Sequence, residues 1–129
     1  MTSARILAVD DSPTILEMIS AILTSGGYEV ITAADGNEAL VAARAESPDL
    51  ILLDVMLPKL DGYRVCRLLK FDSKYKSIPI IMLTAKTEEQ AMATGIRTGA
   101  DQYLTKPVEP ERLLAAVAEE LAKAQRQGS

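Results

Sequence analysis

The chain has 129 residues, a formal net charge of −4 at pH 7 and a sequence pI near 4.8. This length fits one domain, and the acidic balance argues against a protein that binds nucleic acid directly, because such proteins usually carry a basic face. The chain contains no histidine, which excludes zinc hydrolases and serine–histidine triads, and no apolar run approaches the roughly 18 residues of a membrane span, so we expect a soluble, cytoplasmic protein with no membrane partner.

Strand-like and helix-like segments alternate along the chain. Apolar runs bounded by turn residues predict five strands, at residues 5–9, 28–33, 50–54, 79–84 and 102–105. Apolar residues at helical spacing predict five helices, at residues 13–24, 37–45, 63–71, 87–98 and 109–125. The first of these has Asp11 or Ser12 as its cap and Pro13 in its first turn. Strands that alternate with helices predict parallel βαβ units and an α/β fold.

Residues able to do chemistry stand at the C-terminal ends of four predicted strands: Asp10 and Asp11, Asp54, Thr84, and Lys106. The C-terminal ends of parallel strands meet at one edge, where open α/β sheets place their sites. Each residue alone has an ordinary explanation, since Asp caps helices and loops, Thr is common at strand ends and Lys is usually solvated. Their occurrence together indicates a functional site.

The charges at this edge predict a divalent cation and a phosphoryl group. Three converging carboxylates repel one another, so the site favours a hard cation such as Mg²⁺. Asp11 and Asp54 fit as direct ligands, with Asp10 acting directly or through water. The Asp54 carboxylate can attack a phosphoryl group to form an acyl phosphate. The cation, the Lys106 ammonium and the Thr84 hydroxyl then balance the charge on the transferring group.

The chain resembles the receiver domain of two-component response regulators, of the chemotaxis type, either as a single domain or as an N-terminal receiver. The resemblance rests on ILAVDDSP, LILLDVMLPKLDGY, IPIIMLTA and GADQYLTKP, at residues 6–13, 50–63, 78–85 and 99–107. It implies a doubly wound, five-stranded parallel sheet of the flavodoxin type, in strand order 2-1-3-4-5, flanked by five helices. We assign residues 1–125 to the domain and residues 126–129 to a disordered tail.

The resemblance also implies a role for each acidic residue. Asp54 matches the phosphoacceptor, and Asp10 and Asp11 match the acidic pair for Mg²⁺, with the backbone carbonyl of Met56 as a further ligand. Met56 and Lys86 occupy positions that modulate hydrolysis of the phosphoryl group in this family. Because Met56 is bulky and Lys86 is cationic, we expect both to shield the acyl phosphate from water and to lengthen its lifetime.

The switch elements follow from the same resemblance. Thr84 and Lys106 match the phosphoryl-sensing pair, Tyr103 matches the switch aromatic, whose ring turns inward, and the peptide bond before Pro107 is expected to be cis. The predicted helix at residues 87–98 has a thin apolar face and an internal glycine, which weakens a helix. We expect its face, with the Tyr103 strand and the last helix, to form the output surface.

These expectations describe a phosphorylation-dependent signalling switch rather than an enzyme, because the chain would catalyse only its own phosphorylation and dephosphorylation. The phosphoryl group would come from a phosphohistidine on a sensor histidine kinase or histidine phosphotransfer protein, since this chain has no histidine. A downstream protein target or an output domain would respond to the change. The resemblance allows a phosphorylation-dependent dimer, and the acidic charge of the chain argues against direct nucleic-acid binding.

Three interpretations remain open from the sequence. The chain is a stand-alone receiver, or a receiver excised from a larger regulator such as a winged-helix DNA-binding transcription factor. The usual dimer face of that branch is incomplete here, at Gln102, Ala124 and Gln125. The third class is an aspartate-nucleophile phosphatase or a flavin-binding domain. Met56 stands where such a phosphatase has a second Asp, and the acidic pair would repel a flavin phosphate.

Overall fold

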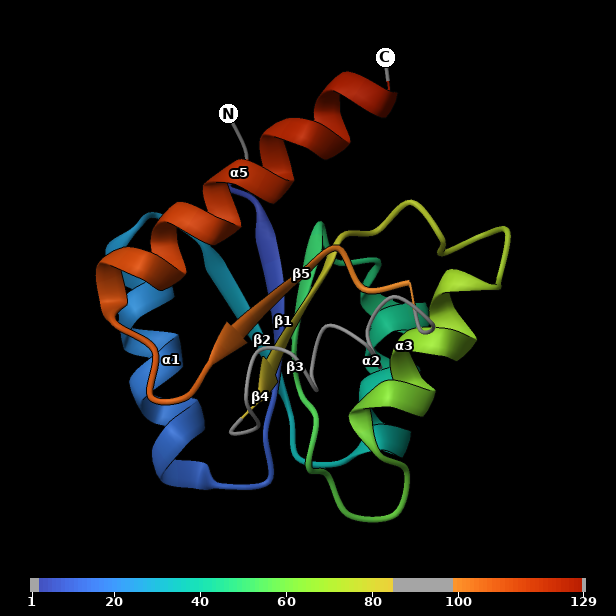
Figure 1. Ribbon diagram of the computed structural model, residues 1–129, viewed down its shortest axis with the longest axis horizontal. Coiled ribbons are helices and arrows are strands. Elements are labelled where there is room, and N and C mark those ends of the chain that lie inside the picture. The colour runs from blue at the N-terminus through green and yellow to red at the C-terminus, as the bar shows by residue number, and fades with distance from the viewer. Residues whose placement is uncertain (1–2, 85–98, 129) are drawn as a thin grey trace.

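The computed structural model describes residues 3–84 and 99–128, with only the backbone described for residues 126–128. Five parallel strands form one sheet between two layers of helices (Figure 1). The strands are β1 (Arg5–Val9), β2 (Glu29–Ala33), β3 (Leu50–Asp54), β4 (Ile80–Thr84) and β5 (Gln102–Thr105). The helices in the described part of the chain are α1 (Pro13–Ser25), α2 (Gly36–Glu46), α3 (Gly62–Lys70) and α5 (Pro110–Gly128).

The strand order is β2-β1-β3-β4-β5, which confirms the predicted doubly wound sheet. β1, β3 and β5 have the predicted bounds, and the other described boundaries agree or differ by one residue, apart from the end of α5. The helix expected at residues 87–98 lies outside the described residues. The backbone of residues 126–128 continues α5, where a disordered tail was predicted. Arg126 and Gln127 are good helix formers, so the helix can continue past its predicted end at residue 125.

The central strands are buried on both faces, which explains their continuous apolar sequences. Every residue of β3 and β4 is buried. Successive side chains point to opposite faces of a sheet, so Leu7 and Ile51 belong to the core beneath α2 and α3. Ile6 and Leu50 belong to the core beneath α1 and α5. Figure 1 shows the two helical layers on opposite faces of the sheet.

The N-terminal caps of the helices are residues other than the acidic pair Asp10 and Asp11 that follows β1. The side chains of Ser12, Asp35 and Asp61 each accept a hydrogen bond from a backbone N–H three residues later, at the starts of α1, α2 and α3. Ser12 therefore caps α1, and the capping explanation for Asp10 and Asp11 does not hold.

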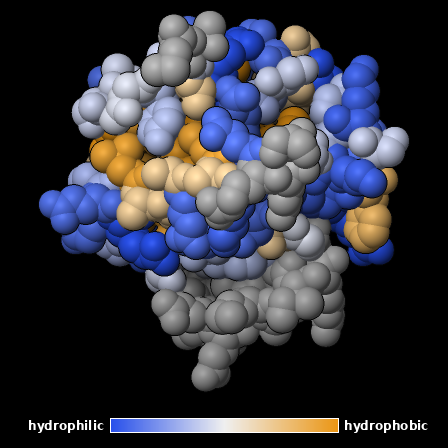
Figure 2. All heavy atoms as spheres, turned by 90° about the horizontal axis from the view of Figure 1, so that it is seen from above, coloured by the Kyte–Doolittle hydropathy of each residue, from blue (hydrophilic) through white to orange (hydrophobic). Residues whose placement is uncertain are grey.

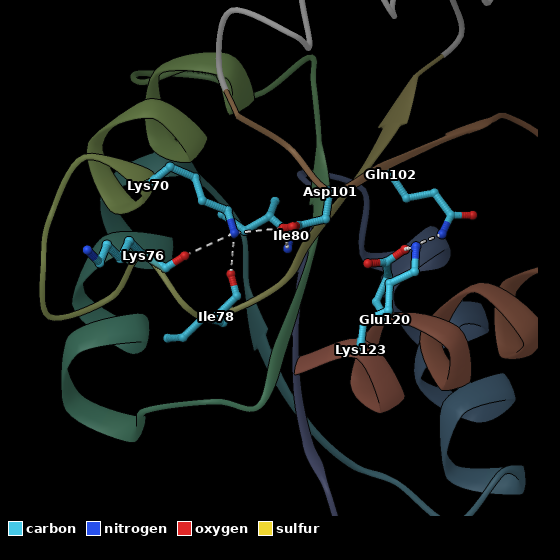
Figure 3. A network of polar contacts seen from close by, with 8 residues as sticks. All are labelled: Lys70, Lys76, Ile78, Ile80, Asp101, Gln102, Glu120 and Lys123. Atoms are coloured by element: carbon cyan, nitrogen blue, oxygen red, sulfur yellow. Dashed lines mark hydrogen bonds and ion pairs between the residues drawn. The ribbon is translucent and has the colours of Figure 1, made fainter. Parts of the chain in front are cut away.

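Lys70, at the end of α3, ties the α3–β4 loop to the start of β5. Its ammonium donates to the carbonyl oxygens of Lys76 at 3.3 Å and Ile78 at 2.8 Å, and pairs with Asp101 at 2.7 Å (Figure 3). The same Asp101 carboxylate oxygen accepts the Ile80 N–H at 2.8 Å. Because Ile80 begins β4 and Asp101 precedes β5, these contacts hold the starts of the two strands together.

A second polar contact joins β5 to α5. The buried Glu120 carboxylate accepts a hydrogen bond of 2.7 Å from the Gln102 amide, and the Lys123 ammonium lies 3.5 Å from the same oxygen (Figure 3). A buried carboxylate without partners would be costly. Gln102 and Lys123 thus allow Glu120 to lie between strand and helix.

The surface at the starting ends of the strands is mostly hydrophilic, with hydrophobic residues exposed in patches (Figure 2). Within the part of the chain that the structure describes, no helix is long and apolar enough to span a membrane.

Candidate functional site

The predicted site residues meet at the C-terminal edge of the sheet. Asp10 follows β1, Asp54 ends β3, Thr84 ends β4 and Lys106 follows β5. The strand ends are in step, with Asp54 level with Leu83 in the β3–β4 register. Side chains from distant parts of the sequence are thereby brought to one place.

Lys106 joins two of the acidic residues. Its ammonium nitrogen lies 3.1 Å from Asp10 Oδ2 and 3.0 Å from Asp54 Oδ1. Burial opposes the charge on Lys106, but the hydrogen bonds to Asp54 and Asp10 and the charges of both outweigh it and raise the pKa of Lys106. The ammonium therefore stays protonated between the two carboxylates.

Asp54 is less favourably placed than its lysine partner. Burial is the largest effect and raises the pKa of Asp54, and the charge of Asp10 adds to it. The hydrogen bonds from Lys106 and from the Met56 N–H, the latter at 3.2 Å, only partly offset this rise. The surroundings favour the charged form of Lys106 but the neutral form of Asp54. Lys106 lies beside two carboxylates, whereas the buried Asp54 lies beside one ammonium and a second carboxylate. A further cation would stabilise the ionised site.

The three carboxylates are close enough to hold such a cation. Asp10, Asp11 and Asp54 each offer an oxygen, and these oxygens lie within 4.8 Å of one another. Asp10 and Asp54 are buried, whereas Asp11 is exposed and open to solvent. An all-oxygen, anionic donor set suits a hard cation such as Mg²⁺. The residues present therefore fit the predicted metal.

Comparison with known proteins identifies the family. The model of the response regulator receiver domain matches residues 6–118. The chain belongs to this family. A receiver domain of this kind is a signalling switch of two-component systems.

Three relatives illustrate the similarity. The DNA-binding response regulator MtrA of Mycolicibacterium smegmatis is 46% identical over 113 residues, covering 88% of this chain and 48% of MtrA. The chain thus spans about half the length of this curated relative. The chemotaxis response regulator CheY4 of Vibrio cholerae superimposes with a TM-score of 0.87 at 42% identity, covering 92% of this chain and 99% of CheY4.

The third relative is the receiver domain of the sensor histidine kinase PA1611 from Pseudomonas aeruginosa, which has a magnesium ion coordinated in its active site cleft. Its TM-score is 0.86 at 33% identity, and the match covers 94% of this chain and 99% of that domain.

Backbone contacts that sequence reasoning missed orient the acidic residues of this receiver. Asp10 Oδ1 accepts the Ser12 N–H at 2.9 Å, and Asp54 Oδ1 accepts the Met56 N–H at 3.2 Å. In both cases an Asp side chain bonds its own backbone two residues on, as Asp commonly does in turns. The turn that follows each strand is the only sequence signal for these contacts.

Gly62 keeps the start of α3 close behind Asp54. Its N–H donates to the Val55 carbonyl oxygen at 3.0 Å. A Cβ atom at this position would collide with the Asp54 carbonyl oxygen and with Val55 Cα. The predicted helix at residues 63–71 gave no sign of this contact, whereas the structure shows that a side chain at position 62 would clash with the backbone of Asp54 and Val55.

Of the remaining predicted residues, all but Lys86 lie in the described part of the chain. Thr84 is buried, Tyr103 is half-buried against the α2–α3 core, and the Lys106–Pro107 peptide bond is cis, as predicted. The Met56 side chain is 69% exposed. Lys86 lies outside the described residues, so the effect expected of Met56 and Lys86 on the lifetime of the acyl phosphate stays a prediction.

Asp54→Asn is expected to stabilise the metal-free receiver at pH 7, because it removes one of two buried carboxylates that repel each other while Lys106 keeps Asp10 as its partner. The raised pKa of Asp54 means that the folded state disfavours its charge. In the unfolded chain the Asp54 carboxyl has its ordinary pKa of 3.8. The cost of its charge in the folded state is therefore largest above the folded-state pKa, and it fades as the pH falls through that pKa. The Asn variant should therefore melt above the wild type at pH 7, and the gap should shrink toward pH 4.

The measurement is thermal unfolding in EDTA across this pH range. Asp11→Asn is the control, because Asp11 is exposed and its charge costs little. A variant at position 54 that melts below the wild type at pH 7 would contradict the electrostatic argument.

Proposed function

We propose that this receiver accepts a phosphoryl group on Asp54, with Mg²⁺ held by Asp10, Asp11, Asp54 and the backbone carbonyl of Met56. The observation that carries the proposal is the buried Asp54 carboxylate beside both the Lys106 ammonium, at 3.0 Å, and the Asp10–Asp11 pair. Nucleophile, counter-charge and cation ligands thus share one edge of the sheet, which is the arrangement that phosphoryl transfer needs.

The contacts suggest different roles for the two carboxylate oxygens of Asp54. Oδ1 pairs with the Lys106 ammonium and accepts a hydrogen bond from the Met56 N–H. These two contacts fix the orientation of the carboxylate. Oδ2 then forms the new bond to phosphorus, while the bond from phosphorus to the donor breaks and the donor leaves. Lys106 remains charged and balances the phosphoryl oxygens. Mg²⁺, when bound, neutralises charge on the carboxylates and on the transferring group.

Phosphorylation is expected to require a divalent cation. With acetyl phosphate and Mg²⁺, intact mass should rise by one phosphoryl group, and EDTA should slow the reaction by at least about 10-fold. The ligands that hold the metal also lie around the nucleophile, so its removal leaves the carboxylates to repel the incoming phosphate. Equal incorporation with and without EDTA would contradict the proposed metal role.

We infer that Thr84, Lys106 and Tyr103 form the switch. Thr84 is buried at the end of β4, and Tyr103 lies on the neighbouring strand, level with Met82. Added phosphoryl oxygens would attract Thr84 and Lys106, and the Tyr103 ring would move further into the space beside β4. The output surface then comprises β5, α5 and residues 87–98, of which the last lie outside the described residues.

Amide exchange is expected to report this switch. On phosphorylation, exchange should change across β5 and α5, because the phosphate biases an element with two arrangements of similar energy. β2, at the opposite edge of the sheet from β5, serves as the internal control. Identical exchange maps of both states across β5 and α5 would exclude this surface as the output.

The proposed donor is a phosphohistidine on a sensor histidine kinase or a histidine phosphotransfer protein. The proposed reader is a downstream protein or an output domain. MtrA supports a second candidate, in which this chain is the receiver part of a longer DNA-binding regulator, because the match covers only about half of MtrA. The complete reading frame distinguishes a stand-alone receiver from the receiver part of a longer regulator.

A phosphorylation-dependent dimer would use β5 and α5, where the Gln102–Glu120 hydrogen bond is made within one chain.

A further inference from the structure

A groove of about 890 Å³ lies between α2 and α3, and none of the residues of the acidic cluster lines it. Its lining includes three arginines, two apolar side chains and one carboxylate: Arg44, Arg64, Arg67, Leu68, Phe71 and Asp72. The groove is therefore distinct from the phosphorylation site and differs from it in the sign of its charge.

The exposed side of α3 supplies most of this lining. Arg64, Arg67, Leu68 and Phe71 are spaced i, i+3, i+4 and i+7, so they lie along one face of the helix and its cap. The opposite face of α3, which includes Val65, Cys66 and Leu69, is buried in the core. Arg44, from the last turn of α2, adds a third guanidinium across the groove.

The charge of this groove is not neutralised within the described chain. Lys59, Lys70, Lys106 and Lys123 each pair with a carboxylate. No ion pair among the described residues involves the three groove arginines. The carboxylate of Asp72 is already engaged by the Lys74 N–H, at 2.9 Å. A positive groove on a chain with a net charge of −4 suits an acidic ligand.

The groove also presents apolar surface. Phe71 is 75% exposed and Leu68 is 49% exposed, and both belong to the small set of large hydrophobic side chains exposed in the described structure. The Arg67 guanidinium lies over the Phe71 ring, 5.7 Å from its centroid. Aromatic residues and arginine beside one another are typical of protein interfaces.

We propose that this groove docks an acidic, amphipathic helical segment of a partner protein. Apolar side chains of the segment cover Leu68 and Phe71, and its carboxylates pair with Arg44, Arg64 and Arg67. A helix laid in a groove presents both kinds of side chain at i, i+3, i+4 and i+7 spacing. A small anionic ligand fits less well, because small-molecule sites bury most of their ligand, whereas all three arginines here are exposed.

The test uses the full chain and a fluorescein-labelled helical peptide with leucines at i, i+3, i+4 and i+7 flanked by glutamates. Fluorescence anisotropy should show saturable binding that weakens with added salt. Arg67→Glu and Phe71→Ser should each weaken binding by about 10-fold or more. Arg112→Glu, which makes the same charge change at an exposed position of α5, should stay within about twofold. Circular dichroism checks that each variant is folded.

Several results would overturn the proposal. These are no saturable binding, equal binding of a peptide with Gln in place of Glu, or an equal loss in Arg112→Glu. Binding of ATP to the groove in place of the peptide would assign it to nucleotides instead. Asp54→Asn should leave peptide binding unchanged, so failure of the phosphorylation proposal and failure of the docking proposal give different results.

Discussion

Asp54→Asn is expected to lower phosphoryl incorporation from acetyl phosphate by more than about 1,000-fold. The amide nitrogen and oxygen of Asn are poor nucleophiles, while the shape of the side chain is retained. The Lys106–Asp10 ion pair, at 3.1 Å, does not involve position 54, so the rest of the pocket keeps its geometry. The measurement is intact mass over time with acetyl phosphate and Mg²⁺.

Asp11→Asn is the matched control for this loss. It removes one carboxylate from the same cluster but leaves the nucleophile in place. Incorporation should therefore persist in this variant, at a higher Mg²⁺ requirement, because Mg²⁺ usually takes only one or two carboxylates. If Asp54→Asn incorporates phosphate at the wild-type rate, the acceptor is another residue.

Lys106→Met is expected to slow phosphorylation by about 100-fold to 1,000-fold. The ammonium contacts Asp10 at 3.1 Å and Asp54 at 3.0 Å, and it is the charge that remains beside the phosphoryl oxygens during transfer. Methionine keeps much of the length of the side chain and removes the charge. The two carboxylates then repel each other more strongly, which moves the pKa of Asp54 further upward.

Binding of Mg²⁺ separates the role of Lys106 from that of the metal ligands. The ligands remain in Lys106→Met, and one competing cation is gone, so Mg²⁺ should bind at least as tightly as in the wild type. Lys59→Met is the control, because it removes a lysine that pairs with Asp35 rather than with the cluster. A wild-type phosphorylation rate in Lys106→Met would show that the lysine is a structural counter-ion only.

Most of the fold follows from the sequence because the central strands are buried on both faces. The runs that end at Val9 and Asp54 are continuously apolar and have the bounds that the structure shows. The predicted end of α5, at residue 125, falls short of its end at Gly128 because Arg126 and Gln127 are polar but are good helix formers. Polarity indicates exposure, and an exposed segment at the end of a helix can still be helical.

The candidate site was predictable in its members but not in its contacts. A parallel sheet brings Asp10, Asp54 and Lys106 to one edge whatever their separation in the sequence. That Lys106 bridges Asp10 and Asp54 depends on the reach of one side chain across β1 and β3. The closeness of Gly62 to Asp54 depends on the path of a loop. Neither follows from residue spacing.

The same limit applies to the arginine groove. Arg44 lies far from Arg64 and Arg67 in the sequence, and only the packing of α2 beside α3 brings the three guanidiniums to one groove. Each arginine alone has the appearance of an ordinary solvated residue.

Locating the phosphoryl group on the wild-type chain tests the central claim most directly. The protein is treated with acetyl phosphate and Mg²⁺, the acyl phosphate is reduced with borohydride to homoserine, and peptides are sequenced by tandem mass spectrometry. We expect homoserine at position 54, only in samples that contained Mg²⁺. Homoserine at position 10 or 11 with unmodified Asp54 would contradict the assignment of Asp54 as the phosphoacceptor.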